Sequence, residues 1–312
     1  MISAVVSSRR TEAVVVRFVA PPRAQVDRAV FARPPLSQWQ EFDGLLRGLE
    51  WPRLDELNAF VPPRAPRFVA QTPELLQDGL HYEARIAQRQ QIATREHNWH
   101  DLLNAVIWLR HPELKSALNA RQCAEISRIG AKQRTRPQCA LTHFDEAGIV
   151  VLLRDACLLE LWDTHDWHGL FWRERAAWHD GRVQVEVFGH ALLEHALAPG
   201  QLLVGKALAV WQDDLPVQAQ NAQRNKSTLS AVAAAIGQGR LLNDPQELRP
   251  LPLSGIPGWR NENEIEDFYR SAPCFCPLRA GRRYPEPLRI GAPCAVSRAH
   301  ASVQASHSIG PL

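Results

Sequence analysis

Four side chains that can form hydrogen bonds lie within seven residues of one another in the segment 95–121, which reads REHNWHDLLNAVIWLRHPELKSALNAR. They are Asn98, His100, Asp101 and Asn104, and most of their neighbours are large and apolar. A histidine beside a carboxylate can act as a general base with a tuned pKa, or as one ligand of a divalent metal ion. The segment therefore predicts a site in which His100 is base or ligand and Asp101 orients it or binds the metal. Asn98 and Asn104 would position the substrate.

The same four residues also have a purely structural explanation. Asn98 is a suitable N-cap for a helix over residues 98–109, and Asp101 would sit in its first turn, where a negative charge complements the helix dipole. His100 and Asn104, four residues apart on one helix face, could bond neighbouring backbone. His97 and His100 are three residues apart, whereas the helical zinc motif needs two histidines four apart with a glutamate between them. The sequence leaves both interpretations open.

Further candidate groups lie downstream of this segment. Asp145 and Glu146 fall at the tip of a predicted hairpin, where an acidic pair can bind metal or act in acid/base catalysis, although Asp145 also suits a tight turn. Gly189 and His190 stand where a predicted strand meets a helix, a place where backbone can approach a ligand closely. Lys206 begins another strand and could bind an anion or simply be solvated.

These groups would be positioned by a mixture of helices and strands. We expect an α+β fold, with mixed helices packed around a small, mostly antiparallel sheet. Helices are predicted from residue 72, over 82–91, 98–109, 112–129, 155–161, 166–178, 191–198 and 229–236, with shorter pieces over 35–49 and 51–60. Strands are predicted over 183–188 and 206–211, and a β-hairpin over 139–153 with residues 145–148 at its turn.

The composition of the 312 residues is that of a folded protein, with 45% hydrophobic and 22% charged residues. We expect a disordered extension at 1–15, one globular domain at 16–283 and a disordered tail at 284–312. No stretch is long and apolar enough to span a membrane, and the N-terminus lacks a signal-peptide layout, so a cytoplasmic protein with reduced thiols is expected. The preference for Arg over Lys is typical of a GC-rich bacterial genome.

The net charge of +3 is too small to imply nucleic-acid binding by itself. A basic segment at 121–136 could contact phosphates, but it lacks the interleaved aromatic residues of a single-strand stacking platform, so nucleic acid is not the expected partner. The first hypothesis is a hydrolase-type enzyme that uses acid/base or metal-assisted chemistry on a small molecule. The alternatives are a non-catalytic binding or scaffold protein and, less favoured, an RNA- or nucleotide-binding protein.

Several long motifs carry a family resemblance. In order they are NWHDLLNAVIWLRHPELKSALNARQ (98–122), LTHFDEAGIVV (141–151), DWHGLFW (166–172), VFGHALLEHALAP (187–199), GKAL (205–208) and GIPGW (255–259). Over about residues 35–280 the chain resembles the bacterial family catalogued as domain of unknown function 3025, which has no assigned reaction. The resemblance implies that the polar residues within the motifs are the ones to test, Asn119 and Arg121 among them. Cys274 and Cys276 depart from the family's final motif, so it implies no metal role for them.

The prediction for the site is therefore specific in its residues, while the metal, the substrate and the oligomeric state stay undetermined. A divalent metal ion is the cofactor that such a set could hold. The catalytic residues are predicted to be His100, Asp101, Glu146 and His190. The substrate-binding residues are predicted to be Asn98, Asn104, Arg121 and Lys206.

Overall fold

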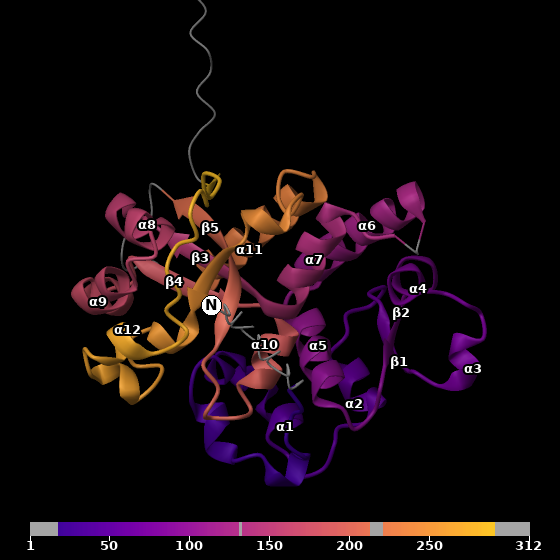
Figure 1. The fold of residues 1–312 in the computed structure, drawn as a ribbon. Coiled ribbons are helices and arrows are strands. Elements are labelled where there is room, and N and C mark those ends of the chain that lie inside the picture. Colours follow the sequence, from indigo (N-terminus) through magenta and orange to yellow (C-terminus); the bar gives the residue numbers. More distant parts are fainter. Residues whose placement is uncertain (1–17, 131–132, 213–220, 291–312) are drawn as a thin grey trace, which may run out of the picture.

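The computed structural model describes residues 18–130, 133–212 and 221–290 of the chain. The predicted extension at 1–15 lies outside the described residues, as does the part of the predicted tail from 291 to 312. The architecture is α+β, as the sequence predicts: helices surround a mixed sheet of five strands, and a separate small sheet has two strands (Figure 1).

The larger sheet has the strand order β4-β3-β5-β6, and β7 pairs with the remaining part of β5. Its strands are β3 (Gly148–Leu153), β4 (Val183–Val187), β5 (Val204–Gln212), β6 (Arg249–Pro252) and β7 (Leu288–Ile290). The sequence predicts a mostly antiparallel sheet, whereas β3 runs antiparallel to β4 but parallel to β5, and β5 runs antiparallel to β6 but parallel to β7. Every residue of the central strand β3 is buried, which explains its continuous apolar run GIVVLL.

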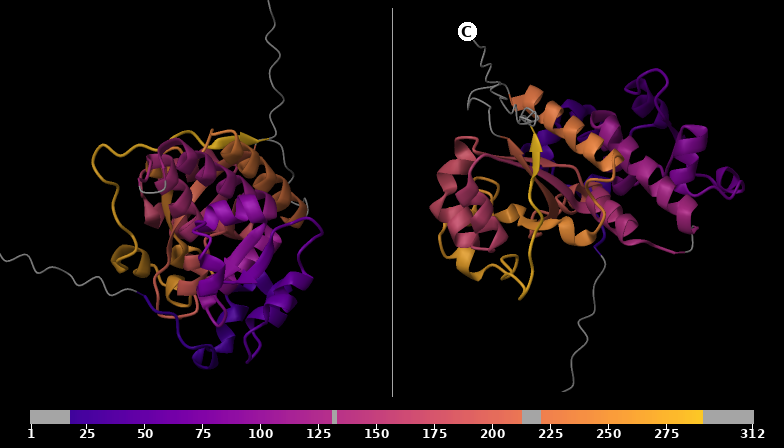
Figure 2. Two further views of the ribbon diagram at one scale, coloured as in Figure 1. Left: turned by 90° about the vertical axis from the view of Figure 1, so that its right-hand side faces the viewer. Right: turned by 90° about the horizontal axis from the view of Figure 1, so that it is seen from above.

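Helices lie on both sides of this sheet. In Figure 1, α8, α9 and α12 lie to its left and α4 to α7 to its right, and Figure 2 shows α11 running beside α6. The α-helices are α1 (Asp43–Leu46), α2 (Leu54–Ala59), α3 (Pro73–Leu76), α4 (Tyr82–Arg89), α5 (Trp99–Arg110), α6 (Pro112–Ile129), α7 (Arg136–Ala147), α8 (Ala156–Asp163), α9 (Arg175–His179), α10 (His190–His195), α11 (Asn221–Gly237) and α12 (Phe268–Ser271). Single short turns of 3₁₀ or π helix occur at Arg23–Gln25, Arg28–Ala32, Leu36–Phe42, Gly169–Arg173, Pro245–Glu247, Leu253–Gly255 and Glu262–Glu264.

Helices α5 and α6 begin and end where the sequence predicts. The side chain of Asn98 accepts a hydrogen bond from the backbone N–H of Asp101 at 3.0 Å and so caps α5. Pro112 then starts α6, because a proline ring is tolerated in the first turn of a helix but disfavours helix at the residue before it. Most residues of α5 are buried, which makes it the central helix of its side of the molecule.

The β-hairpin predicted over residues 139–153 is wrong. Residues 136–147 form α7, and only the second half of the segment, from Gly148, is a strand. Thr135 and Gln138 form a reciprocal capping box at the start of α7, which the prediction overlooked. Ala140, Leu141 and Phe144 then follow the helical period and are fully buried. The correction places Asp145 and Glu146 in the last turn of a helix rather than at a hairpin tip.

Two further expectations need correction. The tail does not begin at 284, because β7 extends the sheet and the hydroxyl of Tyr284 lies 2.9 Å from Nε2 of His165. The sequence also gave no sign of the parallel two-stranded sheet formed by β1 (Arg67–Ala70) and β2 (Gln91–Thr94).

In agreement with the expectation of no membrane span, no helix of the described residues combines the length and apolar character needed to cross a bilayer.

Candidate functional site

The candidate site lies where α5, α7 and α10 meet. His100 lies in the first turn of α5, Glu146 in the last turn of α7, and His190 is the first residue of α10. Helix α10 packs against both other helices, so residues 90 positions apart in the sequence come into contact.

The turn before His190 fixes its position against α7. The backbone N–H of Gly189 donates to the carbonyl of Gly148 at 2.9 Å. A Cβ atom on Gly189 would lie only 2.4 Å from the Cα of Ala147, so any side chain larger than hydrogen would force the two segments apart. The backbone at Gly189 therefore does make the close approach that the sequence predicts, but its neighbour is the end of α7 and not a ligand.

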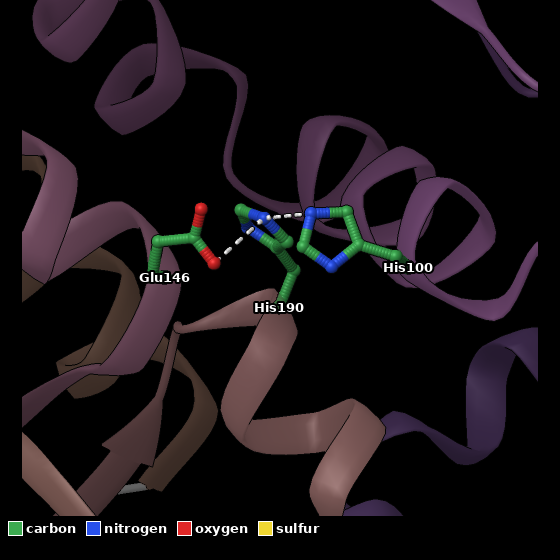
Figure 3. Close-up of side chains that lie close together, drawn as sticks. All are labelled: His100, Glu146 and His190. Carbon is green, nitrogen blue, oxygen red and sulfur yellow. Dashed lines mark hydrogen bonds and ion pairs between the residues drawn. The ribbon is translucent and has the colours of Figure 1, made fainter. Parts of the chain in front are cut away.

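The two imidazoles and one carboxylate converge on a common point. The Nε2 atoms of His100 and His190 are 3.0 Å apart, with the rings nearly perpendicular at 85°. Oε2 of Glu146 lies 3.7 Å from Nε2 of His190, and one donor atom from each of the three residues lies within 4.8 Å of the others. Figure 3 shows the three side chains pointing toward one another from separate helices.

A carboxylate stands behind each imidazole. The Nδ1–H of His100 donates to Oε2 of Glu194 at 2.9 Å. Nδ1 of His190 faces Oδ2 of Asp145 at the longer distance of 3.9 Å. In metal sites such carboxylates fix the orientation of the ring and raise its basicity toward the metal. Both histidines therefore have their Nε2 atoms directed toward the shared point and their Nδ1 atoms toward an acid.

The almost fully buried Lys115 holds Asp145 in place. Its ammonium donates to Oδ1 of Asp145 at 2.6 Å and to Oδ1 of Asn104 at 2.8 Å. The amide nitrogen of Asn104 in turn donates to the hydroxyl of Tyr82 at 2.9 Å. Asn104, predicted to position substrate, thus belongs to a polar chain that begins beside His190 and ends at Tyr82.

The electrostatic environment differs between the four titrating groups at the centre. The hydrogen bond that His100 donates to Glu194 raises the pKa of His100, whereas burial lowers the pKa of His190 to about 3 and keeps that ring neutral. Burial raises the pKa of Glu146. Burial acts in the same direction on Asp145, but positive charge nearby, above all the ammonium of Lys115, outweighs it, so the pKa of this carboxyl is lowered.

The cluster carries an excess of negative charge when its imidazoles are neutral. Three carboxylates, those of Asp145, Glu146 and Glu194, face the two rings, and Lys115 supplies one positive charge in contact with Asp145. Three negative charges and one positive charge leave an excess of two. A divalent cation at the shared point would balance this excess on the partly buried cluster.

A cavity of about 290 Å³ opens beside the three side chains. Its wall is polar and includes residues of α4, α5, α6 and α7. Besides His100, Glu146 and His190, the lining includes Tyr82, Glu83, Arg95, Asn104, Lys115, Asn119, Gln122, Arg134, Thr142 and Asp145. A larger hollow of about 530 Å³ near Trp259 and Arg260 contains none of the predicted site residues.

Two of the predicted site residues take the structural role that the sequence left open. Asn98 caps α5 as described. Asp101 does not orient His100: it accepts hydrogen bonds from the backbone N–H of Arg95 at 2.6 Å and from the Arg95 guanidinium at 2.7 and 3.1 Å. Asp101 borders the cavity, but its carboxylate is fully engaged in joining the segment before α5 to the start of the helix.

Two other predicted residues lie away from the cavity. The guanidinium of Arg121 donates to the backbone carbonyl of Ile236 at 2.8 Å and to Asn243 at 3.0 Å, which ties α6 to the end of α11. Lys206 is an exposed residue of β5 and does not line the cavity. The substrate-binding roles predicted for Arg121 and Lys206 have no support in these positions.

Three residues of the site were missed. Glu194 lies four residues after His190 in α10, and its contact with His100 depends on how α10 packs on α5. Lys115 gives a sequence signal in retrospect, because it is one of four lysines in the chain and directly follows the buried Leu114. Tyr82 begins the helix predicted over residues 82–91, and nothing in the sequence marks it as part of a site.

The other metal-capable residues do not add to this site. Among the described residues, the group of histidine, cysteine, aspartate and glutamate side chains arranged to hold a metal is His100, Glu146 and His190. Cys274 is buried and Cys276 exposed, and neither belongs to it. Of the basic segment, Lys132 lies outside the described residues, and Arg136 pairs with Asp244.

Comparison with known proteins supports the resemblance seen in the motifs. A family model described as "Protein of unknown function (DUF3025)" matches residues 66–279, a span that contains every residue of the candidate site. No curated protein and no solved structure matches the chain.

Proposed function

The chain belongs to the DUF3025 family, whose description names no reaction, and we propose from the geometry of the site that it is a metal-dependent hydrolase. His100, His190 and Glu146 would hold one divalent metal ion, and the adjoining cavity would receive a small polar substrate. The observation that carries the proposal is that two imidazole Nε2 atoms and one carboxylate meet within 4.8 Å, each ring being backed by an acid.

The donor set favours a catalytic over a structural metal. Structural zinc sites have four protein ligands, whereas catalytic sites keep one position open for water or substrate. Two histidines and one glutamate form such a three-ligand set, and the cavity lies on the open side. A metal ion in this setting lowers the pKa of a bound water to near neutrality and polarises a substrate carbonyl or phosphoryl oxygen.

The same three donors also suit iron, since two histidines and a carboxylate form the facial triad of non-haem iron oxygenases. Hydrolysis is the better supported reaction because the cavity wall is rich in groups that stabilise charge. The ammonium of Lys115 lines the cavity, and such a group stabilises the oxyanion that develops during hydrolysis.

The scaffold alternative has less support. It would require an exposed tryptophan surface without a polar pocket, yet none of the ten tryptophans is exposed and the pocket is present. The large apolar side chains that are exposed among the described residues are scattered through the chain, as in most soluble domains.

Metal analysis of the purified protein tests the proposal. We expect stoichiometric metal in the wild type and in His168→Ala, because His168 pairs with Glu266 and does not line the cavity. We expect the metal to be lost from His100→Ala and Glu146→Gln. The metal-loaded wild type should then hydrolyse at least one member of a panel of esters, amides and phosphate esters, and the two site variants should not.

Two results would reject the proposal. One is a wild type that takes up no divalent metal from a defined buffer. The other is equal metal content in all four proteins, which would mean that any bound metal lies elsewhere.

A further inference from the structure

A chain of polar contacts fixes the direction in which the Tyr82 hydroxyl can donate. The ammonium of Lys115 can only donate hydrogen bonds, so the side-chain oxygen of Asn104 must face it, at 2.8 Å. The amide nitrogen of Asn104 then faces the Tyr82 oxygen, at 2.9 Å. Because an amide nitrogen is also only a donor, the phenol oxygen is the acceptor in this contact. The proton of Tyr82 must therefore point elsewhere.

The anchor of this chain is rigid. Only 4% of the Lys115 side chain is exposed, and its ammonium is tied to Asp145 at 2.6 Å and lies 5.4 Å from the centre of the Trp108 ring. Turning the Asn104 amide over would set its NH₂ group against this ammonium and its oxygen against the phenol. The reversed arrangement would leave a buried ammonium facing a donor, which is strongly unfavourable.

The proton of Tyr82 is free to meet a ligand. Within the part of the chain that the structure describes, no hydrogen bond from the Tyr82 hydroxyl to a protein acceptor is formed, and Tyr82 lines the same cavity as His100 and His190. Burial raises the pKa of Tyr82 above its ordinary value, so the hydroxyl keeps its proton at neutral pH. The cavity wall thus carries an oriented donor that the protein itself does not use.

We propose that Tyr82 is the specificity residue of this site, and that its hydroxyl recognises an oxygen acceptor on the substrate at a distance from the bond that is cleaved. This inference rests on the proposed metal-dependent function. The substrate class is then a small molecule with two polar ends, a cleavable bond at His100, His190 and Glu146 and a carboxylate or carbonyl oxygen at Tyr82. The cavity volume of about 290 Å³ suits a small molecule rather than a folded chain.

Tyr82 is linked to the proposed metal ligands only through other side chains. Asn104, Lys115 and Asp145 form the contacts that connect Tyr82 with His190. Within the described residues, the Tyr82 hydroxyl forms no hydrogen bond with His100, His190 or Glu146. We assign it the role of positioning the substrate rather than that of a catalytic acid.

Alkyl hydroxamates provide the test, because the hydroxamate group chelates a catalytic metal while the far end of the chain can be varied. Binding to the zinc-loaded protein would be measured by calorimetry for a series of chain lengths ending in a carboxylate, a primary amide or a methyl group. In the wild type, one chain length ending in an oxygen acceptor should bind more tightly than its methyl counterpart. In Tyr82→Phe this preference should fall by about tenfold, the worth of one hydrogen bond to a polar or charged group.

Two variants sharpen the test. Tyr284→Phe is the matched control, since Tyr284 contacts His165 outside the cavity, and it should keep the wild-type preference. Asn104→Asp retains the phenol but replaces the amide donor with an acceptor, so the Tyr82 proton should turn toward the new carboxylate. That variant should lose the preference even though the tyrosine is present, which a merely structural role of Tyr82 does not predict.

The outcomes separate the two proposals. Loss of the preference in Tyr82→Phe and Asn104→Asp, with unchanged binding of the methyl-ended hydroxamates, supports the inference. An unchanged preference in Tyr82→Phe overturns the inference alone, because hydroxamate binding would still show a working metal site. If the wild type binds neither zinc nor any of the hydroxamates, the proposed function is overturned, and the inference with it.

Discussion

Replacing Glu194 by glutamine tests whether the acid behind His100 serves a metal. In the structure Oε2 of Glu194 accepts the Nδ1–H of His100 at 2.9 Å, and glutamine can keep this contact through its amide oxygen while losing the charge. Removing such an outer carboxylate typically weakens metal binding by about 10- to 100-fold. Because the hydrogen bond survives in Glu194→Gln, we expect zinc binding to weaken by the low end of this range, about tenfold or 1.4 kcal/mol.

The effect should depend on pH in a defined direction. Glu194 raises the pKa of His100, so in the wild type a proton competes with the metal up to a higher pH than in the variant. At a pH above the pKa of His100 in the wild type, the wild type binds zinc more tightly than Glu194→Gln by the full factor. As the pH falls, the wild type loses affinity first, and the ratio of the two dissociation constants should shrink.

Competition against a chromophoric zinc chelator would give both dissociation constants at about pH 8 and about pH 6. Glu266→Gln is the matched control, since Glu266 pairs with His168 at 2.8 Å outside the cavity, and it should bind zinc as the wild type does. Equal zinc affinity of Glu194→Gln and the wild type at the higher pH would refute the reasoning. So would the same loss in both glutamine variants.

The other predictions concern stability and reactivity. Lys115→Met should destabilise the metal-free protein by about 3 kcal/mol in urea unfolding, because it leaves the partly buried Asp145 without its cation; a loss below about 1 kcal/mol would contradict this. Arg121→Ala should lower stability by about 1 kcal/mol through the lost contacts with α11, yet leave zinc affinity unchanged, whereas weaker zinc binding would contradict a purely structural role for Arg121. Burial raises the pKa of Cys274 to about 11, so at pH 8 Cys274 should be alkylated far more slowly than the exposed Cys276. Its alkylation should accelerate as the pH rises toward 11. Peptide mass spectrometry after brief labelling measures both rates, and equal rates at pH 8 would contradict the prediction.

The helices that carry the site could be predicted because their signals are local. Asn98 caps α5, Pro112 separates it from α6, and the apolar residues between them follow the helical period. The hairpin error had a local cause as well. Residues 139–153 end in the apolar run of β3, and the turn-forming pair Asp145 and Gly148 suggested a second strand before it. The capping box of α7 starts at Thr135, between the helix predicted over 112–129 and the hairpin predicted over 139–153.

Local sequence patterns could not predict that the residues of the site come together. The contacts of His100 with His190 and Glu194 join positions 90 and 94 residues apart and depend on the packing of α10 between α5 and α7. The sequence marked His100, Glu146 and His190 by residue type and by their apolar surroundings. It could not show that Asp101 faces Arg95 instead of His100, since either neighbour lies within reach of a residue at the start of a helix.

The position of the two acids on α7 is itself an argument for a cation. Asp145 and Glu146 occupy the last turn of the helix, where the backbone dipole presents its negative end and a carboxylate is unfavourable. Burial adds to this cost for both groups. Lys115 compensates Asp145 at 2.6 Å, but Glu146 forms no ion pair with a lysine or arginine among the described residues, and its Oε2 atom faces the neutral ring of His190 at 3.7 Å. A carboxylate left without a cation at such a partly buried position is expected where a ligand supplies the missing charge, and a metal between Glu146, His100 and His190 would supply it.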